Sequence, residues 1–379
     1  MGKQLHIVSF DVPFPANYGG VIDVFYKLKS LHARGVRIIL HCFLYGQKQQ
    51  APELALYCEQ VYYYRRTIGV QGFSLLRPYI VNSRKNTALL NNLLSHEAPI
   101  LFEGLHSCYF LNHPKLVNRN KYVRAHNIEH EYYLALAQSE KKWWKRFYYK
   151  IESQLLRQYE EIYSQAEQIF AISKEDQKYF RGKNLNTAYL PAFHSNTVVE
   201  SLVGRGEYCL YHGNLSVAEN EEAVMYLIDN VFSKLSYPVK IAGANPSIDL
   251  ITRITDFSHI ELFDNPTDEE MSSLIENAHV HVLYSAKRSG LKLKLVNSLF
   301  KGRFVLVNNN LIETGPLESV CKIANNSQEY IQSIKDLWTV SFTEVEIESR
   351  KEKLLEEFSI EKNTQKLIET IFLNKQGVV

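Results

Sequence analysis

Residues 286–309, AKRSGLKLKLVNSLFKGRFVLVNN, contain the parts of one α/β unit in order. A cationic loop with a glycine leads into a short amphipathic helix, and Lys301 and Gly302 then lead into a β-branched strand. The start of a helix offers free backbone N–H groups and the positive end of the helix dipole, which suit a phosphate. The stretch therefore predicts a phosphate site in an α/β domain, although a glycine turn before a surface helix is also an ordinary structural feature.

Length and composition limit the class of protein. With 379 residues and 45% hydrophobic residues, we expect two packed domains. The net charge of +2 gives no overall attraction to nucleic acid. Five cysteines are scattered singly, which favours a reducing compartment over disulfides or a structural zinc site. We see no signal peptide and no apolar run near the roughly 20 residues that span a bilayer, so we expect a cytoplasmic protein.

Strand and helix patterns alternate along both halves of the chain, which predicts two doubly wound parallel sheets. The expected strands are 5–10, 37–43, 60–64, 100–102, 122–125, 169–172, 208–212, 239–242, 259–263, 280–284 and 304–307. The expected helices are 20–34, 87–97, 131–165, 221–232, 268–276, 328–338 and 345–373. The predicted divisions are a first domain 1–190, a linker 191–204, a second domain 205–345 and a C-terminal helix 346–379. Ligands of such sheets bind beyond the carboxyl ends of the strands.

Six segments in order resemble the family 4 glycosyltransferases. They are DVPFPANYGGVIDVFYKLKSLHARG, YVRAHNIEHEYY, AISKED, YHGNLSVAENEEAV, IAGANP and SGLKLKLVNSLFKGRFVLVNN. The resemblance covers nearly the whole chain and is closest to bacterial sugar transferases that build surface polysaccharides. It implies the GT-B fold, in which two Rossmann-like domains face each other across a cleft, with acceptor in the first and nucleotide-sugar donor mainly in the second. It also implies a C-terminal helix that crosses back and a metal-independent, retaining transfer with no cofactor besides the nucleotide-sugar substrate.

The segment RAHNIEHE, which follows an expected strand and opens a helix, gathers titratable groups. The resemblance implies that His126 faces the transferred sugar, and we expect Arg124 and Glu129 beside it as catalytic residues. A histidine there can donate a hydrogen bond to a sugar hydroxyl or to a leaving phosphate. For the acceptor we expect contacts from Asn127, Glu103 and His106.

Simpler structural roles stay open for some of these residues. Asn127 could cap the helix, and Glu129 could favour its dipole. Glu103 and His106 could equally be a satisfied pair in a loop. His126 and His130 have the spacing of a zinc helix, but the order His-Asn-Ile-Glu-His displaces the usual glutamate, so we expect no metal site.

The donor site is expected to combine glycine loops, cations and hydrogen-bonding side chains. The candidates are Gly19, Gly20, Gly213, Asn214, Asp264, Asn265, Lys287, Arg288, Ser289, Gly290, Leu291, Lys294 and Asn297. The family carries two glutamates eight positions apart in this region, and Ser289 and Asn297 stand at those places. Asn297 can still hydrogen-bond ribose hydroxyls. The chain lacks G-x-G-x-x-G, which disfavours a nicotinamide oxidoreductase.

Residues 141–151, KKWWKRFYYKI, are the densest basic and aromatic run. On a helix, Trp143, Phe147 and Ile151 share one stripe. The stripe fits either an anionic membrane surface, where a polyprenyl-linked acceptor would lie, or ordinary packing on the sheet. No nucleic-acid-binding module surrounds the run, so nucleic acid is not an expected partner.

Together these features predict a hexosyltransferase that moves a sugar from a nucleotide diphosphate to a glycan or lipid-linked acceptor in surface polysaccharide synthesis. It would work in the cytoplasm or at the inner face of the membrane. Two alternatives stay open: a nucleotide-sugar 2-epimerase, and a catalytically silent relative that binds only a glycan or a partner.

Overall fold

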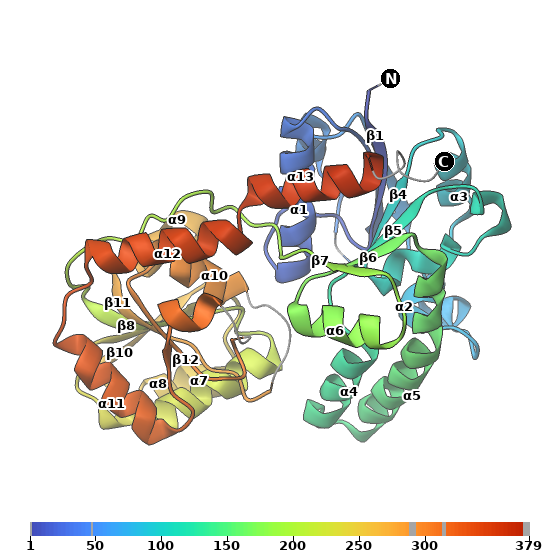
Figure 1. Cartoon of the computed structure of the whole chain (residues 1–379). Helices are drawn as coiled ribbons and strands as arrows, with labels where there is room; N and C mark the ends of the chain where they lie inside the picture. The colour runs from blue at the N-terminus through green and yellow to red at the C-terminus, as the bar shows by residue number, and fades with distance from the viewer. Residues whose placement is uncertain (1, 47, 288–292, 313–315, 374–379) are drawn as a thin grey trace. The chain divides into compact units, whose positions relative to one another are not determined.

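The computed structural model describes residues 2–46, 48–287, 293–312 and 316–373. They form two compact units (Figure 1). The first unit is Met1–Ser195 with Ile360–Val379, and the second is Asn196–Ser359. Each unit has one sheet whose strands are all parallel, with helices around it, which confirms the predicted pair of Rossmann-like domains. Among the described residues, no helix is both long and apolar enough to cross a membrane.

The sheet of the first unit has the strand order β3-β2-β1-β4-β5-β6-β7. Its strands are β1 (Gln4–Ser9), β2 (Arg37–Leu44), β3 (Gln60–Arg65), β4 (Ile100–Glu103), β5 (Lys121–Ala125), β6 (Gln168–Ala171) and β7 (Thr187–Tyr189). Its α-helices are α1 (Gly19–Ala33), α2 (Tyr79–Asn82), α3 (Thr87–Leu94), α4 (Glu129–Ser139), α5 (Trp143–Tyr159), α6 (Lys174–Gly182) and α13 (Ile360–Phe372). Its 3-10 helices are η1 (Pro52–Leu56), η2 (Gly69–Gly72), η3 (Leu105–Phe110), η4 (Pro114–Leu116) and η5 (Glu160–Gln165). Because the order reverses between β1 and β4, their carboxyl ends mark the expected ligand position.

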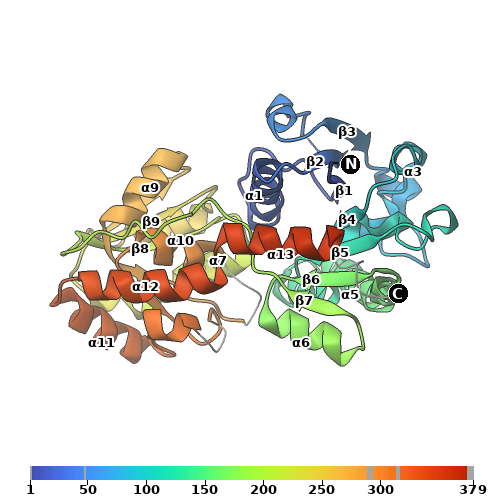
Figure 2. The same ribbon diagram turned by 45° about the horizontal axis from the view of Figure 1, so that its top comes forward.

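Alternation along the central strand builds a core on each face of this sheet. Leu5 and Ile7 of β1 join one apolar cluster, whereas Val8 joins the other. The cluster of Leu5 also takes Leu367 and Ile368 from α13, so the C-terminal helix completes the first unit. Figures 1 and 2 show α13 beside α1.

The sheet of the second unit has the strand order β10-β9-β8-β11-β12-β13, which reverses between β8 and β11. Its strands are β8 (Tyr208–His212), β9 (Val239–Gly243), β10 (Ile260–Asp264), β11 (Ala278–Val282), β12 (Phe304–Val307) and β13 (Lys322–Ile323). Its α-helices are α7 (Ala218–Asn230), α8 (Ile248–Ile254), α9 (Asp268–Asn277), α10 (Leu293–Lys301), α11 (Ser327–Trp338) and α12 (Glu344–Glu357). Its 3-10 helices are η6 (Phe232–Lys234) and η7 (Pro316–Val320).

Two long helices expected from the sequence are each two helices. The stretch 131–165 contains α4 and α5, which lie side by side (Figure 1). The turn between them is held by Glu140, whose carboxylate accepts the N–H of Lys142 at 2.9 Å. The stretch 345–373 divides into α12 and α13, which belong to different units.

Candidate functional site

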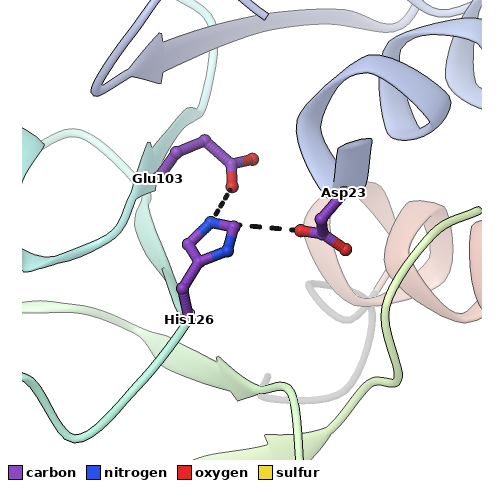
Figure 3. Close-up of side chains that lie close together, drawn as sticks. All are labelled: Asp23, Glu103 and His126. Carbon is purple, nitrogen blue, oxygen red and sulfur yellow. Dashed lines mark hydrogen bonds and ion pairs between the residues drawn. The ribbon is translucent and has the colours of Figure 1, made fainter. Parts of the chain in front are cut away.

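The predicted acidic and histidine side chains come together at the carboxyl ends of β4 and β5. Glu103 is the last residue of β4, Arg124 lies in β5, and His126 follows β5. Helix α1 adds Asp23 and Lys27, which the sequence did not single out. Figure 3 shows Asp23, Glu103 and His126 pointing toward one another.

Two buried cations neutralise the two carboxylates of this group. Lys27 Nζ lies 2.7 Å from Glu103 Oε1 and 2.9 Å from Asp23 Oδ2. Arg124 makes a bidentate pair with Asp23, Nε to Oδ2 at 3.0 Å and Nη2 to Oδ1 at 2.9 Å. These four side chains are fully buried. Such charges are tolerated in a protein interior only when they are paired and hydrogen-bonded, as they are here.

The network also fastens the backbone that follows β7. Arg124 donates to the carbonyl oxygens of Leu190 and, at 3.1 Å, Pro191. Asp23 Oδ1 accepts the N–H of Phe193 at 2.8 Å. Because the guanidinium is buried and bound to protein groups, its geometry is that of a positioning residue. The catalytic role expected for Arg124 stays a prediction.

Of the two ring nitrogens of His126, Nε2 is hydrogen-bonded and Nδ1 has no hydrogen-bond partner among the described residues. Its Nε2 lies 3.0 Å from Glu103 Oε2. Burial acts to raise the pKa of Glu103, but Lys27 and the hydrogen bond from His126 outweigh it and lower that pKa. Glu103 is therefore an ionised acceptor to which Nε2 of His126 donates, which leaves Nδ1 as the second polar atom of the ring. Within the described part of the chain, this buried Nδ1 has no hydrogen-bond partner.

A second pair lies beside this histidine. His106 Nδ1 and Glu129 Oε1 are 3.6 Å apart, too far for a hydrogen bond, and neither atom has a hydrogen-bond partner among the described residues. Burial raises the pKa of Glu129 to about 8, which favours the neutral carboxyl, a form that can donate a hydrogen bond. Burial also lowers the pKa of His106 well below its usual value.

Small and aromatic neighbours hold the two histidines close together. The ring centroid of Phe10 is 5.3 Å from that of His126 and 5.6 Å from that of His106. Gly104 has φ +71°, and a Cβ there would lie 3.1 Å from His106 Nδ1 and 3.7 Å from His126 Cδ2. The result is a buried polar wall with open hydrogen-bonding atoms from His106, His126 and Glu129.

The structure removes some simpler roles for these residues. Helix α4 has Ile128 as its N-cap, so Asn127 does not cap it. Glu129 lies in the first turn of α4, but burial raises its pKa and so disfavours the charged form that the helix dipole would stabilise. His130 Nδ1 lies 3.6 Å from Glu160 Oε1, whereas the acidic side chains that lie close to His126 are Asp23 and Glu103.

Asp23, Glu103 and His126 could nevertheless be considered as ligands, because one atom from each lies within 4.8 Å of the others. Both carboxylates are already paired with Lys27 or Arg124. A divalent cation would have to displace these cations, so the charges of the site disfavour a metal ion.

In the second unit, several expected donor residues share the carboxyl edge of β8, β9 and β10. Gly213 and Asn214 follow β8, and a Cβ on Gly243 would lie 1.8 Å from the carbonyl oxygen of Gly213. Asp264 ends β10, and Asn265 donates its N–H to the carbonyl of Gly243 at 3.0 Å. Three loops therefore meet at Gly243, where the backbone of Gly213 packs too closely to leave room for a side chain.

The side chain of Lys294, from α10, contacts residues at the carboxyl end of β8 and in the helix that follows it. Its Nζ lies 3.0 Å from Asn220 Oδ1 and 5.0 Å from the ring centroid of Tyr211. Asn220 Nδ2 in turn donates to the carbonyl of Asn214 at 2.9 Å. Lys294 and Asn214 are therefore linked through the side chain of Asn220, and their expected contacts with the donor stay a prediction.

The other donor candidates are placed less closely or lie outside the described residues. The carbonyl of Lys287 accepts a hydrogen bond from Ser285 Oγ at 2.7 Å, and Ser285 Oγ also binds Glu219 at 2.7 Å. Asn297 Oδ1 accepts from Asn196 at 2.8 Å. Arg288, Ser289, Gly290 and Leu291 lie outside the described residues.

Gly19 and Gly20 belong to the first unit. They begin α1, and a Cβ on Gly20 would lie 2.7 Å from the ring of Phe10. Phe10 packs on His126, so these glycines let α1 start close to the histidine site. Their expected contact with donor stays a prediction.

The basic and aromatic run forms the first half of α5. Trp143 is 79% exposed, Phe147 63% and Ile151 42%. The alternative that this stripe packs on the sheet is therefore wrong. Leu156 supplies the buried apolar contact of α5 instead.

Comparison with known proteins supports the fold class first. The chain superimposes on sucrose-phosphate synthase from Thermosynechococcus elongatus with a TM-score of 0.71 and 12% identity, over 97% of this chain and 98% of that one. It superimposes on Anabaena HepE in complex with UDP and glucose with a TM-score of 0.66 and 12% identity, over 97% and 99%. The chain thus has the GT-B architecture of these structures.

In sequence, the chain is similar to an uncharacterized 44.6 kDa protein in the cps region of Klebsiella pneumoniae. The two are 24% identical over 320 residues, which cover 80% of this chain and 82% of that protein. No family model matches the chain.

Proposed function

We propose that the protein is a glycosyltransferase that moves a hexose from a nucleotide diphosphate to a glycan or polyprenyl-linked acceptor. The observation that carries the proposal is the open Nδ1 of His126 beside Glu103, at the strand-order reversal of a GT-B unit. The GT-B neighbour bound to UDP and glucose supports the donor class. The relative found in a cps region supports a role in surface polysaccharide synthesis.

The proposed mechanism relies on position and charge. Glu103 fixes the tautomer and orientation of His126, whose Nδ1 then accepts a hydrogen bond from a sugar hydroxyl. Lys294 and the loop at Gly213 hold the diphosphate and stabilise its charge as it leaves. No metal ion and no protein nucleophile take part, and the resemblance favours retention of configuration.

The site is expected to work in the cytoplasm. The five cysteines are free thiols, as is usual in a reducing compartment. A polyprenyl-linked acceptor would bring the enzyme to the inner face of the membrane.

Two measurements test the proposal. Calorimetric titration with UDP and GDP should show binding of at least one nucleotide, and no binding of either would refute a donor site. His126→Ala should abolish transfer from a radiolabelled donor and leave nucleotide affinity nearly unchanged. The matched control is His32→Ala, an exposed histidine in the last turn of α1, which should behave like wild type.

A binding-only protein is the second candidate, and a specific observation favours it. Asn297, which stands where the family has a ribose-binding glutamate, already holds Asn196. A protein of this class would bind nucleotide or glycan in titration, yet release no nucleoside diphosphate with any donor and acceptor. A 2-epimerase would instead convert the nucleotide sugar without an acceptor.

A further inference from the structure

We propose that the first unit docks on an anionic lipid bilayer through two apolar and basic segments, residues 65–77 and residues 141–151. We call these two segments the docking surface. The inference depends on exposed side chains and charge, and it does not require the proposed transfer reaction.

Helix α5 presents its aromatic residues to solvent. Trp143 is 79% exposed, Trp144 54% and Phe147 63%, although the chain has only three tryptophans. Burial of such side chains normally contributes strongly to a core, so their exposure at adjacent positions needs a reason. Tryptophan side chains are favoured at the membrane–water interface, where one edge is apolar and the other hydrated.

The segment 65–77 is more exposed still. Val70 is 92% exposed, Leu75 81% and Leu76 89%, and Ile68 and Phe73 are more than half exposed. This loop is anchored by its backbone: Tyr79 Oη accepts the N–H of Gly69 at 3.0 Å. Asn82 Nδ2 donates to the carbonyl of Gly72 at 3.0 Å. Its apolar side chains are thus held outward by a defined structure.

The segment 65–77 lies near α5, the helix that contains most of the segment 141–151. The N–H of Ile80, just after the loop, donates to Glu152 of α5 at 2.9 Å. Leu76 and Arg77 line a surface hollow together with Gln158 and Tyr159 at the end of α5. Figure 1 shows α2 beside α5. Exposed apolar side chains therefore lie near both ends of α5, Trp143 at its start and Leu76 beside its last residues.

Charge identifies the partner as an anionic surface. Residues 65–77 contain three arginines, residues 141–151 contain four lysines and one arginine, and neither segment contains Asp or Glu. The exposed cations among them include Arg65, Lys141 and Lys142. Lysine is depleted in protein–protein interfaces, whereas lysine beside exposed tryptophan and leucine is typical of interfacial membrane binding.

The test is flotation of the full chain with vesicles, without donor or acceptor. Binding is expected to vesicles that contain phosphatidylglycerol and to be much weaker with phosphatidylcholine alone. Trp143→Ala/Trp144→Ala and Leu75→Ser/Leu76→Ser should each weaken partition at least about tenfold. Lys141→Gln/Lys142→Gln should weaken it by about thirtyfold, since each cation near an anionic surface contributes about 1 kcal/mol.

The matched control is Ile248→Ala/Val345→Ala, two residues of the second unit that are 81% and 77% exposed. This variant should float like wild type. Absence of binding to anionic vesicles, or equal binding by wild type and all variants, would overturn the proposal. So would a concentration-dependent dimer that Trp143→Ala/Trp144→Ala dissociates, because a second copy would then cover the surface. A chain that floats but transfers no sugar would refute only the proposed function.

Discussion

Removing the buried ammonium of Lys27 is expected to destabilise the first unit. In Lys27→Met the side chain keeps its length and apolar stem but loses the charge that lies 2.7 Å from Glu103 and 2.9 Å from Asp23. Arg124 still neutralises Asp23, so the unpaired charge falls on Glu103. Removing one partner of a buried pair costs about 3–5 kcal/mol, because the remaining charge is left in a low-dielectric site.

The assay is thermal unfolding followed by circular dichroism. For a unit of this size each kcal/mol shifts the midpoint by about 2–4 °C, so a loss of about 6–20 °C is expected at pH 7. Lys27→Met/Glu103→Gln should recover part of the lost thermal stability, because glutamine at position 103 leaves no unpaired charge in the interior. The single variant should also recover as the pH is lowered, since a proton on Glu103 then neutralises the carboxylate that lost its partner.

A matched control is Lys29→Met, two positions along the same helix, where the residue is exposed. It should shift the midpoint by no more than about 2 °C, as expected for a surface change. If Lys27→Met were as stable as wild type, or if the double variant were less stable than the single one, the reasoning about the buried charges would be wrong.

Two other substitutions address Glu129 and Lys294. Burial raises the folded-state pKa of Glu129 to about 8 from its ordinary 4.5, so the free energy of unfolding of wild type should fall as the pH rises from 4.5 to 8, whereas that of Glu129→Gln should not. Urea unfolding across this pH range measures both free energies. The same pH dependence in the two proteins would contradict the expectation. Lys294→Ala should lower affinity for a nucleoside diphosphate by about ten- to a hundredfold and leave affinity for the nucleoside unchanged, by calorimetric titration. Lys335→Ala, an exposed lysine of α11, is the control, and an equal loss for both ligands would assign Lys294 to the fold.

Much of the fold followed from periodicity, because the strands of both sheets are short apolar runs ended by polar or glycine residues. The breaks after Ser139 and Glu357 could not be predicted, since neither contains glycine or proline and both depend on tertiary packing. Strands β7 and β13 are three and two residues long, too short to show an alternating pattern.

The site was predictable in part. Glu103 and His126 stood out because they follow strands, and the structure joins them by a hydrogen bond. Asp23 and Lys27 were missed, because a charged pair four residues apart on a helix usually lies in solvent. The available signal was that Val24 and Leu28 flank them on the same buried side of α1, so the pair interrupts an apolar face.

The placement of α13 has a consequence for how the chain folds as it is synthesised. The second unit is continuous in sequence, from Asn196 to Ser359, so all of its residues are translated before α13. The core of the first unit is complete only after Leu367 and Ile368 are translated, because they cover one face of its sheet. The half of the molecule that is translated first is thus finished last, and until then the apolar surface around Leu28 is open to chaperones.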